Sequence, residues 1–235
     1  MSDAARLRLN DAWQQCQRHR HRHYLKIECR PRLMAHKPPA LAHNAPMSAL
    51  EKTPFTGADY LLWEREQPLK HEFVRGEVFA MAGASDAHVT ISGNVFARLR
   101  QHLRASPCRA YISDMKLQIA AADAYVYPDV FVTCSGADAA RSDAKAEPLL
   151  VIEVLSPSTA AYDRGLKFAF YRSLNSLREY VLIDPEHPSV DVFRRNEAGL
   201  WVLHPCGPGQ TVQLESVGLE LTLEQVYEDA APPAA

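Results

Sequence analysis

The stretch Leu149-Leu-Val-Ile-Glu-Val-Leu155 carries the strongest signal about how this chain folds. Apart from Glu153, both its odd-numbered and its even-numbered residues are apolar. This predicts a β-strand that is covered on both faces of its sheet. A lone carboxylate such as Glu153 is costly to bury unless a cation, a metal ion or several hydrogen-bond donors meet it. The sequence therefore has an acid at a position where packing alone favours an aliphatic side chain.

A second acid and a lysine stand where they could meet Glu153. Asp129 follows Pro128 at the head of another apolar strand, twenty-four residues before Glu153, and Lys167 lies on the helix predicted to follow. Two carboxylates on neighbouring strands and one lysine can form a metal-dependent active site. Taken alone, Asp129 also fits a turn and Glu153 a structural salt bridge. Lys167 also fits an ordinary i,i+4 helix pair with Asp163.

Length and composition indicate a soluble globular protein. The chain has 235 residues, of which 47% are hydrophobic and 23% charged, and this is enough for one domain of ordinary size plus an appendage. No apolar stretch approaches the roughly 20 residues that span a bilayer, and the N-terminus has no signal-peptide core. We therefore expect a cytoplasmic protein without membrane contact.

The cysteines agree with that compartment. The five of them, at positions 16, 29, 108, 134 and 206, are odd in number and scattered, and none belongs to a CxxC pair. This usage argues against a disulfide framework or a zinc ribbon and fits a reducing environment.

The first 46 residues differ from the rest in charge. Residues 1–46 contain nine Lys/Arg against three Asp/Glu, whereas the remainder has seventeen against twenty-five. They hold the run Arg18-His-Arg-His-Arg-His23 and a Pro/Ala-rich stretch, so we expect a disordered tail, with a histidine-rich metal tract or a nucleic-acid-binding arm as alternatives. An ordinary domain start follows Met47, so translation from there is a further alternative. The acidic body, residues 47–235, argues against tight nonspecific DNA binding but allows a local basic groove.

After the tail, the pattern predicts an α/β domain around a mixed sheet. Thr56 and Asp59 resemble a capping box for a short helix, and residues 70–81 fit two strands joined at Arg75-Gly76. Ser85 can cap a long amphipathic helix whose expected buried side holds Val89, Val95, Phe96, Leu99 and Leu103. Further strands are predicted near 109–113, 116–120, 126–133, 149–155, 179–184, 190–194, 201–204 and 211–214, with a helix over 163–174 and a closing helix.

The order of these elements, together with their acids, resembles the PD-(D/E)XK nuclease superfamily. More narrowly, the chain resembles the Uma-two family, whose members are described as putative restriction endonucleases, in the segments HEFVRGEVFAM (71–81), YPDVFVT (127–133), PLLVIEVLSPST (148–159) and DRGLKFAFYRSLNSLREYVLIDP (163–185). The resemblance runs from about Thr53 to about Tyr227. It implies a restriction-endonuclease-like core, in which helices flank a mixed sheet, with extra strands at both ends.

The same resemblance implies roles for residues at matching positions. Asp129 and Glu153 would bind the metal ion, and the carbonyl of residue 154 would add a further ligand. In the superfamily's simplest pattern the catalytic lysine stands two residues after the glutamate, which is Leu155 here. The family has its lysine on the next helix, where Lys167 matches. Mg²⁺, for which Mn²⁺ can substitute, suits two carboxylates because it keeps several of its waters.

Four further residues are secondary candidates for the site. Of the two acids that flank the hairpin turn, Glu72 and Glu77, the resemblance favours Glu72, although both fit solvated charges. His88, in the first turn of the long helix, fits a proton shuttle or a surface histidine. Asp114 fits a turn or an acid behind the site. Tyr171 fits the core or a substrate contact.

These features together predict a metal-dependent endonuclease that hydrolyses phosphodiester bonds, with DNA as the first choice of substrate. Lys167 would orient the attacking water or stabilise charge on the phosphate. A homodimer is plausible, because cutting two strands needs two sites. Two alternatives remain open: a non-catalytic nucleic-acid or protein binding module, and a metal-dependent phosphodiesterase acting on RNA or a small phosphoester.

Overall fold

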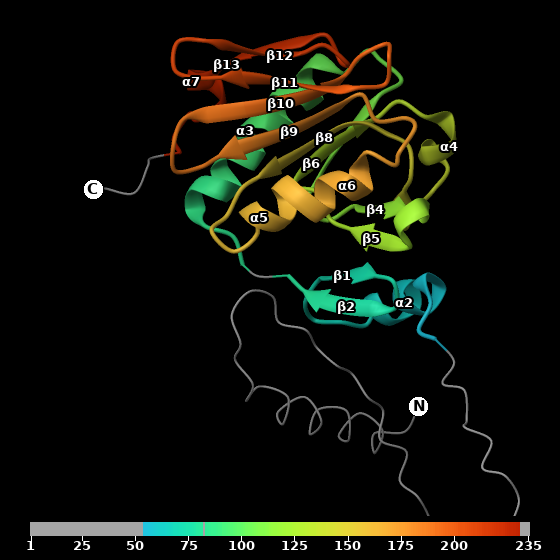
Figure 1. Ribbon diagram of the computed structural model, residues 1–235. Coiled ribbons are helices and arrows are strands. Elements are labelled where there is room, and N and C mark those ends of the chain that lie inside the picture. The colour runs from blue at the N-terminus through green and yellow to red at the C-terminus, as the bar shows by residue number, and fades with distance from the viewer. Residues whose placement is uncertain (1–53, 82, 231–235) are drawn as a thin grey trace, which may run out of the picture.

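The computed structural model describes residues 54–81 and 83–230, which form two mixed β-sheets with helices on their faces (Figure 1). The predictions made for residues 1–46, and for a start at Met47, lie outside the described residues. No helix in the described part of the chain is long and apolar enough to cross a membrane.

The first sheet has five strands in the order β2-β1-β5-β4-β7. They are β1 (His71–Val74), β2 (Glu77–Ala80), β4 (Lys116–Ile119), β5 (Ala124–Val126) and β7 (Ala144–Lys145). β1 and β2 form the predicted hairpin, in which Arg75 and Gly76 have φ angles of 50° and 83°, as a tight two-residue turn requires. Helix α2 (Gly57–Glu64) packs against β1 and begins with the predicted capping box of Thr56 and Asp59.

The second sheet has six strands in the order β11-β10-β9-β8-β6-β3. They are β3 (Arg109–Ile112), β6 (Val130–Thr133), β8 (Pro148–Val154), β9 (Glu179–Asp184), β10 (Ser189–Arg195) and β11 (Trp201–Cys206). β8 runs parallel to β9 and antiparallel to β6, so the sheet is mixed. The strand predicted over 126–133 is divided, because residues 127–129 separate β5 from β6.

Strand β8 is covered on both faces, as its sequence predicts. Its even-numbered side chains from 150 to 154 pack in one cluster with helix α3 (Asp86–His102). On the opposite face, Val151 and Leu155 pack with α6 (Phe168–Tyr171). Figure 1 shows α6 in front of this sheet and α3 behind it. Side chains alternate between the two faces of a strand. Glu153 therefore points to the same face as Val151, toward α6.

Two connections cross between the sheets at the same place. Residues 127–129 lead from β5 in the first sheet to β6 in the second, and residues 113–115 lead from β3 in the second sheet to β4 in the first. The Ser113 N–H donates to the Asp129 carbonyl at 3.0 Å, which ties the two crossings together. We call these two segments, 113–115 and 127–129, the sheet junction.

The helix after β8 begins earlier than predicted and contains a π-helical turn. It runs as α5 (Ala160–Tyr162), the π-helical turn η3 (Asp163–Lys167) and α6, whereas the sequence predicted one helix over 163–174. A π-helical turn within an α-helix is rare and occurs frequently at functional sites.

Helix α3 begins after its Ser85 cap, as predicted, but one residue of its expected buried side is exposed. Val89 is 59% exposed, whereas Val95, Leu99 and Leu103 are buried. The buried stripe runs through Ile91, Val95 and Leu99, and at 100° per residue Val89 falls beside that stripe.

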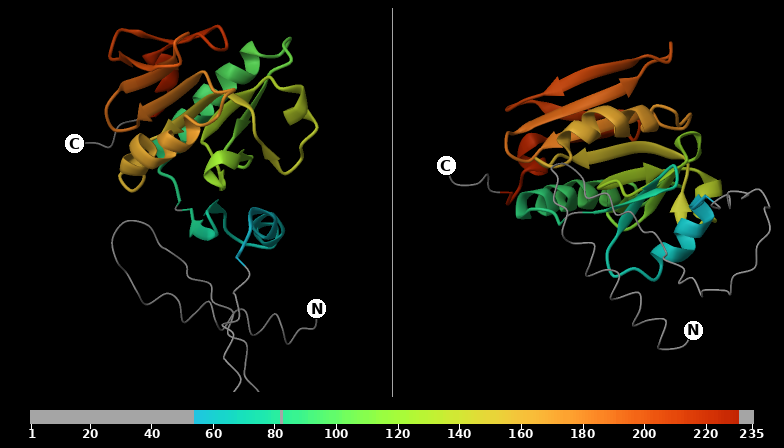
Figure 2. Two further views of the ribbon diagram at one scale, coloured as in Figure 1. Left: turned by 45° about the vertical axis from the view of Figure 1, so that its right-hand side comes forward. Right: turned by 60° about the horizontal axis from the view of Figure 1, so that its bottom comes forward.

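A small third sheet closes the C-terminal end of the described chain. Strands β12 (Thr211–Leu214) and β13 (Leu219–Thr222) and helix α7 (Leu223–Val226) share the apolar cluster of α3. Figure 2 shows them at the opposite end of the molecule from the β1–β2 hairpin. Strands β7 and β13 were not predicted, nor were α4 (Gly136–Ala139) and the short helix η2 (Ala120–Ala122), because such short segments show no periodic pattern.

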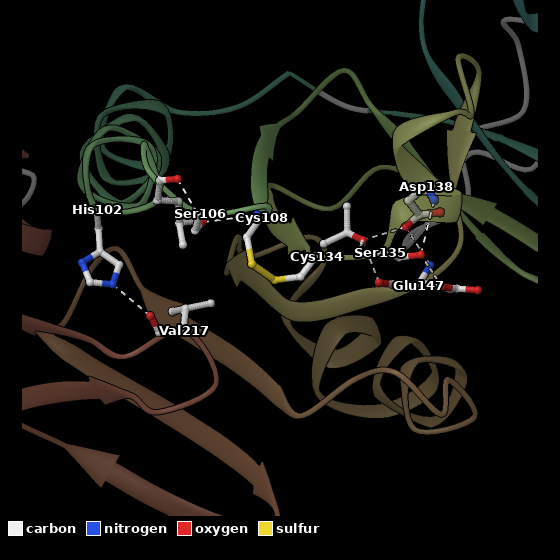
Figure 3. The surroundings of a disulfide bond; sticks show 10 residues. His102, Ser106, Cys108, Cys134, Ser135, Asp138, Glu147 and Val217 are labelled. Carbon is white, nitrogen blue, oxygen red and sulfur yellow. Dashed lines mark hydrogen bonds between the residues drawn. A yellow bond between two sulfur atoms is a disulfide. The ribbon is translucent and has the colours of Figure 1, made fainter.

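The expectation that disulfides are absent is wrong, because Cys108 and Cys134 form one (Figure 3). The antiparallel register of β3 and β6 pairs Arg109 with Thr133, so the two cysteines are the next opposed positions. Their separation of 26 residues gives no hint of this until the register is known. Cys206 is a free thiol.

Reduction of the disulfide is expected to lower the free energy of unfolding by about 3–4 kcal/mol, because the bond restricts the unfolded chain. Urea denaturation with and without a thiol reductant measures the difference. Cys108→Ser should abolish the effect of the reductant, and Cys206→Ser should preserve it. Equal stability of the oxidised and reduced parent proteins would contradict the bond.

Candidate active site

The two acids predicted to bind a metal lie opposite each other at the sheet junction. The antiparallel register pairs Val130 of β6 with Ile152 of β8, so the next position places Asp129 opposite Glu153. The Asp129 N–H donates to Glu153 Oε2 at 3.2 Å, and the Val154 N–H donates to Asp129 Oδ2 at 2.8 Å. Backbone donors of the two strands therefore orient both carboxylates.

Lys167 reaches this pair from the π-helical turn. Its Nζ lies 3.0 Å from Glu153 Oε1 and 3.3 Å from Glu72 Oε1. A third carboxylate, that of Asp163, is 3.7 Å away. Burial by itself lowers the pKa of Lys167, but Glu153, Glu72 and the other neighbouring groups outweigh it and raise the pKa well above its ordinary value. These carboxylates therefore favour the charged form of Lys167.

Two of the secondary candidates join the cluster. The Tyr171 hydroxyl donates to Glu153 Oε1 at 2.6 Å, one helical turn after Lys167. Glu72 comes from β1, in the first sheet, and its Oε1 also accepts the Tyr127 N–H at 3.3 Å. Both sheets therefore contribute acids to one lysine.

His88 approaches from α3, on the more open side of the cluster. Its Nε2 is 3.1 Å from Asp129 Oδ2, and the two side chains are 15% and 17% exposed. Burial lowers the pKa of His88, but hydrogen bonds to Asp129 and to the Val154 backbone outweigh it, so the pKa is raised. The imidazole thus contacts Asp129 and Val154, two of the three residues whose oxygens the family resemblance assigns to a metal ion.

Asp163 is a member of the cluster that the sequence reasoning treated only as a helix partner of Lys167. Its side chain is buried, and burial raises its pKa while Lys167 lowers it. The signal was the spacing of Asp163, Lys167 and Tyr171, four residues apart, which puts all three on one face of a helix. That spacing identifies Asp163 as a residue of the site.

Asp114 and Glu77 remain outside the cluster. The Asp114 side chain is 85% exposed and pairs with Lys70 Nζ at 2.6 Å. It follows Ser113, whose φ of 50° marks a tight turn, so Asp114 fits the turn reading. Glu77 is exposed at the start of β2.

The cluster has more buried negative than positive charge. One lysine and one histidine face four carboxylates, those of Glu72, Asp129, Glu153 and Asp163. Burial raises the pKa of Glu153 from an ordinary 4.5 to about 8; Lys167 opposes the rise, and Asp129 and Asp163 add to it. A bound cation would stabilise the ionised carboxylates and lower that pKa.

The donor set consists of oxygens and is small. It therefore suits Mg²⁺, which needs few protein ligands, better than it suits zinc. Asp129 and Glu153 offer carboxylate oxygens, and the carbonyl of residue 154 is a neutral oxygen donor beside them. Mg²⁺ is bound by few protein ligands because it retains waters. Within residues 54–81 and 83–230, no three or more His, Cys, Asp or Glu side chains are arranged to hold one metal ion.

The family follows from sequence comparison. The family model of Uma2, described as "Putative restriction endonuclease", matches residues 58–224. The chain belongs to the Uma2 family. This confirms the resemblance drawn from the motifs, and the match covers every residue of the cluster.

Two sequences and one solved structure are similar to this Uma2 chain. An uncharacterized protein of Synechocystis sp. is 36% identical over 173 residues, which is 74% of this chain and 91% of that protein. A second from the same organism is 35% identical over 150 residues, covering 63% and 85%. A crystal structure described as a putative nuclease belonging to DUF820, from Anabaena variabilis, matches with a TM-score of 0.62 and 18% identity, over 76% of this chain and 100% of that one. The predicted restriction-endonuclease-like α/β fold is confirmed.

The metal-free Uma2 protein is expected to lose stability as pH rises from about 5 to about 8. Because folding raises the pKa of Glu153 from 4.5 to about 8, the folded state binds more protons than the unfolded state between these values. The free energy of unfolding therefore falls with pH. His88 acts in the same direction, since the stability from its raised pKa is lost as pH rises through that pKa.

Urea denaturation in EDTA across this range tests the expectation. Glu153→Gln should lose less stability with pH than the parent, and Glu220→Gln, an exposed acid on β13, should behave as the parent. Parallel curves for the parent and Glu153→Gln would show that burial does not raise this pKa.

Proposed function

We propose that this Uma2 protein is a Mg²⁺-dependent endonuclease that hydrolyses phosphodiester bonds in DNA. The observation that carries the proposal is the meeting of Asp129, Glu153 and Lys167, from three separate elements, in one buried and negatively charged cluster. The description of the family supports nuclease chemistry. The choices of metal and of DNA rest on the donor set and on the resemblance.

Asp129 and Glu153 would hold the metal ion, with the carbonyl of residue 154. When bound, Mg²⁺ supplies a Lewis acid that activates water and neutralises charge on the scissile phosphate. The hydroxyl of Tyr171 and the N–H groups of Asp129 and Val154 orient the two carboxylates. Such donors behind the ligands set the geometry of a metal site.

Lys167 would stabilise negative charge that develops on the phosphate or orient the attacking water. Its ammonium has three N–H donors, and Glu153 and Glu72 lie at 3.0 and 3.3 Å. The distance of 3.7 Å to Asp163 is too long for a hydrogen bond. These ion pairs hold the ammonium beside Glu153 and Glu72 before substrate binds.

His88 would move a proton at Nε2 on the open side of the cluster. It and Asp129 are its more exposed members, so substrate would approach from this side. An imidazole is suited to that role because its charge changes near neutral pH.

The cluster also weighs against the alternative of a non-catalytic binding module. Three buried carboxylates that face one lysine cost stability, and proteins retain such costs mainly where function needs them. A homodimer is part of the proposal, since cutting both strands of DNA requires two sites. An enzyme acting on RNA or on a small phosphoester would use the same residues, so comparing substrates must separate these functions.

Asp129→Asn, Glu153→Gln and Lys167→Met are each expected to lower cleavage by at least about 100-fold, because each removes a metal ligand or the buried cation. Supercoiled plasmid, linear duplex, single-stranded DNA and RNA are incubated with the full chain in Mg²⁺ and in Mn²⁺. Glu220→Gln is the matched control, because this exposed acid on β13 lies outside the cluster and should leave cleavage unchanged.

Three outcomes would count against the proposal. Equal cleavage by the parent and the three variants would point to a contaminant. Cleavage of RNA alone would show that the substrate is RNA and not DNA. Absence of cleavage by the parent on every substrate would favour a binding module.

A further inference from the structure

Two lysines flank the segment that leads into Asp129. One residue beyond the last pair of β4 and β5, the register places Lys116 opposite Tyr127. On the other side, extending the register of β1 and β5 places Lys70 opposite Pro128. The crossing 127–129 therefore runs between one lysine from each neighbouring strand.

The two ammonium groups lie against the same aromatic ring. The Nζ atoms of Lys116 and Lys70 are 5.2 and 5.8 Å from the centroid of the Tyr127 ring. Lys70 Nζ also donates to the Ser113 carbonyl at 3.3 Å, and the Ser113 N–H bonds to the carbonyl of Asp129. Lys70 therefore contacts both segments of the sheet junction, and Lys116 contacts the crossing 127–129 through Tyr127, which lies two residues before Asp129.

The charge of these lysines is poorly compensated by the protein. The carboxylate that pairs with Lys70 is that of Asp114, which is 85% exposed, and such a pair contributes little. Lys116 has no carboxylate within 4.0 Å in the described part of the chain. An anion that approaches the junction can therefore pair with either ammonium group.

A polyanion is the ligand that fits this arrangement. The chain after residue 46 has seventeen Lys/Arg against twenty-five Asp/Glu, so its overall field repels nucleic acid and attraction must be local. A nucleic-acid strand presents phosphates at regular spacing along its backbone. If one phosphate lies at Asp129 and Glu153, its neighbours pass along the junction.

We propose that Lys70 and Lys116 bind backbone phosphates of the nucleic acid next to the scissile phosphate. The inference rests on the proposed function for the identity of the substrate. Contacts to phosphate fix the position of a strand and do not read its sequence. The pair therefore holds the strand in register with the cluster on any sequence.

The test is the salt dependence of binding, measured on the full chain with fluorescent duplex DNA, single-stranded DNA and RNA in EDTA, where no metal-dependent cleavage occurs. Lys70→Gln/Lys116→Gln should reduce the slope of log affinity against log salt by about 0.9 for each lost contact on duplex, hence about 1.8. Lys70→Arg/Lys116→Arg should retain the parent slope. Arg100→Gln/Arg104→Gln, which removes two exposed cations from the far end of α3, should also leave the slope unchanged.

The results separate this inference from the nuclease function. A lysine-dependent slope in a protein that never cleaves would support the phosphate site and oppose the enzyme. Cleavage by a protein whose slope is the same with and without the lysines would overturn the phosphate site and keep the enzyme. Absence of binding to all three nucleic acids, or an equal loss of slope in the arginine control, would also overturn it. Thermal unfolding of each variant shows that the fold is intact.

Discussion

The contact between the Glu153 carboxylate and the Lys167 ammonium, 3.0 Å apart and buried, is the constraint on which the rest of the structure depends. A carboxylate inside a doubly covered strand needs a cation and donors. The π-helical turn supplies the cation, α6 supplies the Tyr171 hydroxyl, and the crossing into β6 supplies the Asp129 N–H. The first sheet adds Glu72 from β1. Helix, crossing and hairpin therefore converge on one ion pair, Glu153–Lys167.

Much of this cluster could be predicted from sequence, because a carboxylate in an apolar strand is a strong signal. Asp129, Glu153 and Lys167 were placed by pattern and resemblance, and the structure brings them together. The features that were not predicted depend on which strands pair and in which register. The division of residues 126–133 between two sheets falls at Pro128-Asp129, which the predicted strand included. Cys108 and Cys134 become neighbours only when β3 pairs with β6.

The excess of buried acids connects stability to the proposed function. Without a metal ion, burial and mutual repulsion raise the pKa of Glu153, so the ionised cluster is destabilising. A bound divalent cation would offset this cost and stabilise the folded state. His88, whose Nε2 contacts Asp129 Oδ2, would compete with the cation for that carboxylate. In the proposed function, the cluster would hold the scissile phosphate and the two lysines along the junction would hold its neighbours.

The most direct test of the account is a crystal structure of the full chain with Mn²⁺, recorded at a wavelength where manganese scatters anomalously. The account predicts an anomalous peak between the carboxylates of Asp129 and Glu153, with His88 displaced from Asp129, and the loss of that peak in Asp129→Asn. A structure in which Mn²⁺ binds elsewhere, or in which His88 keeps its contact and no peak appears at saturating Mn²⁺, would contradict it.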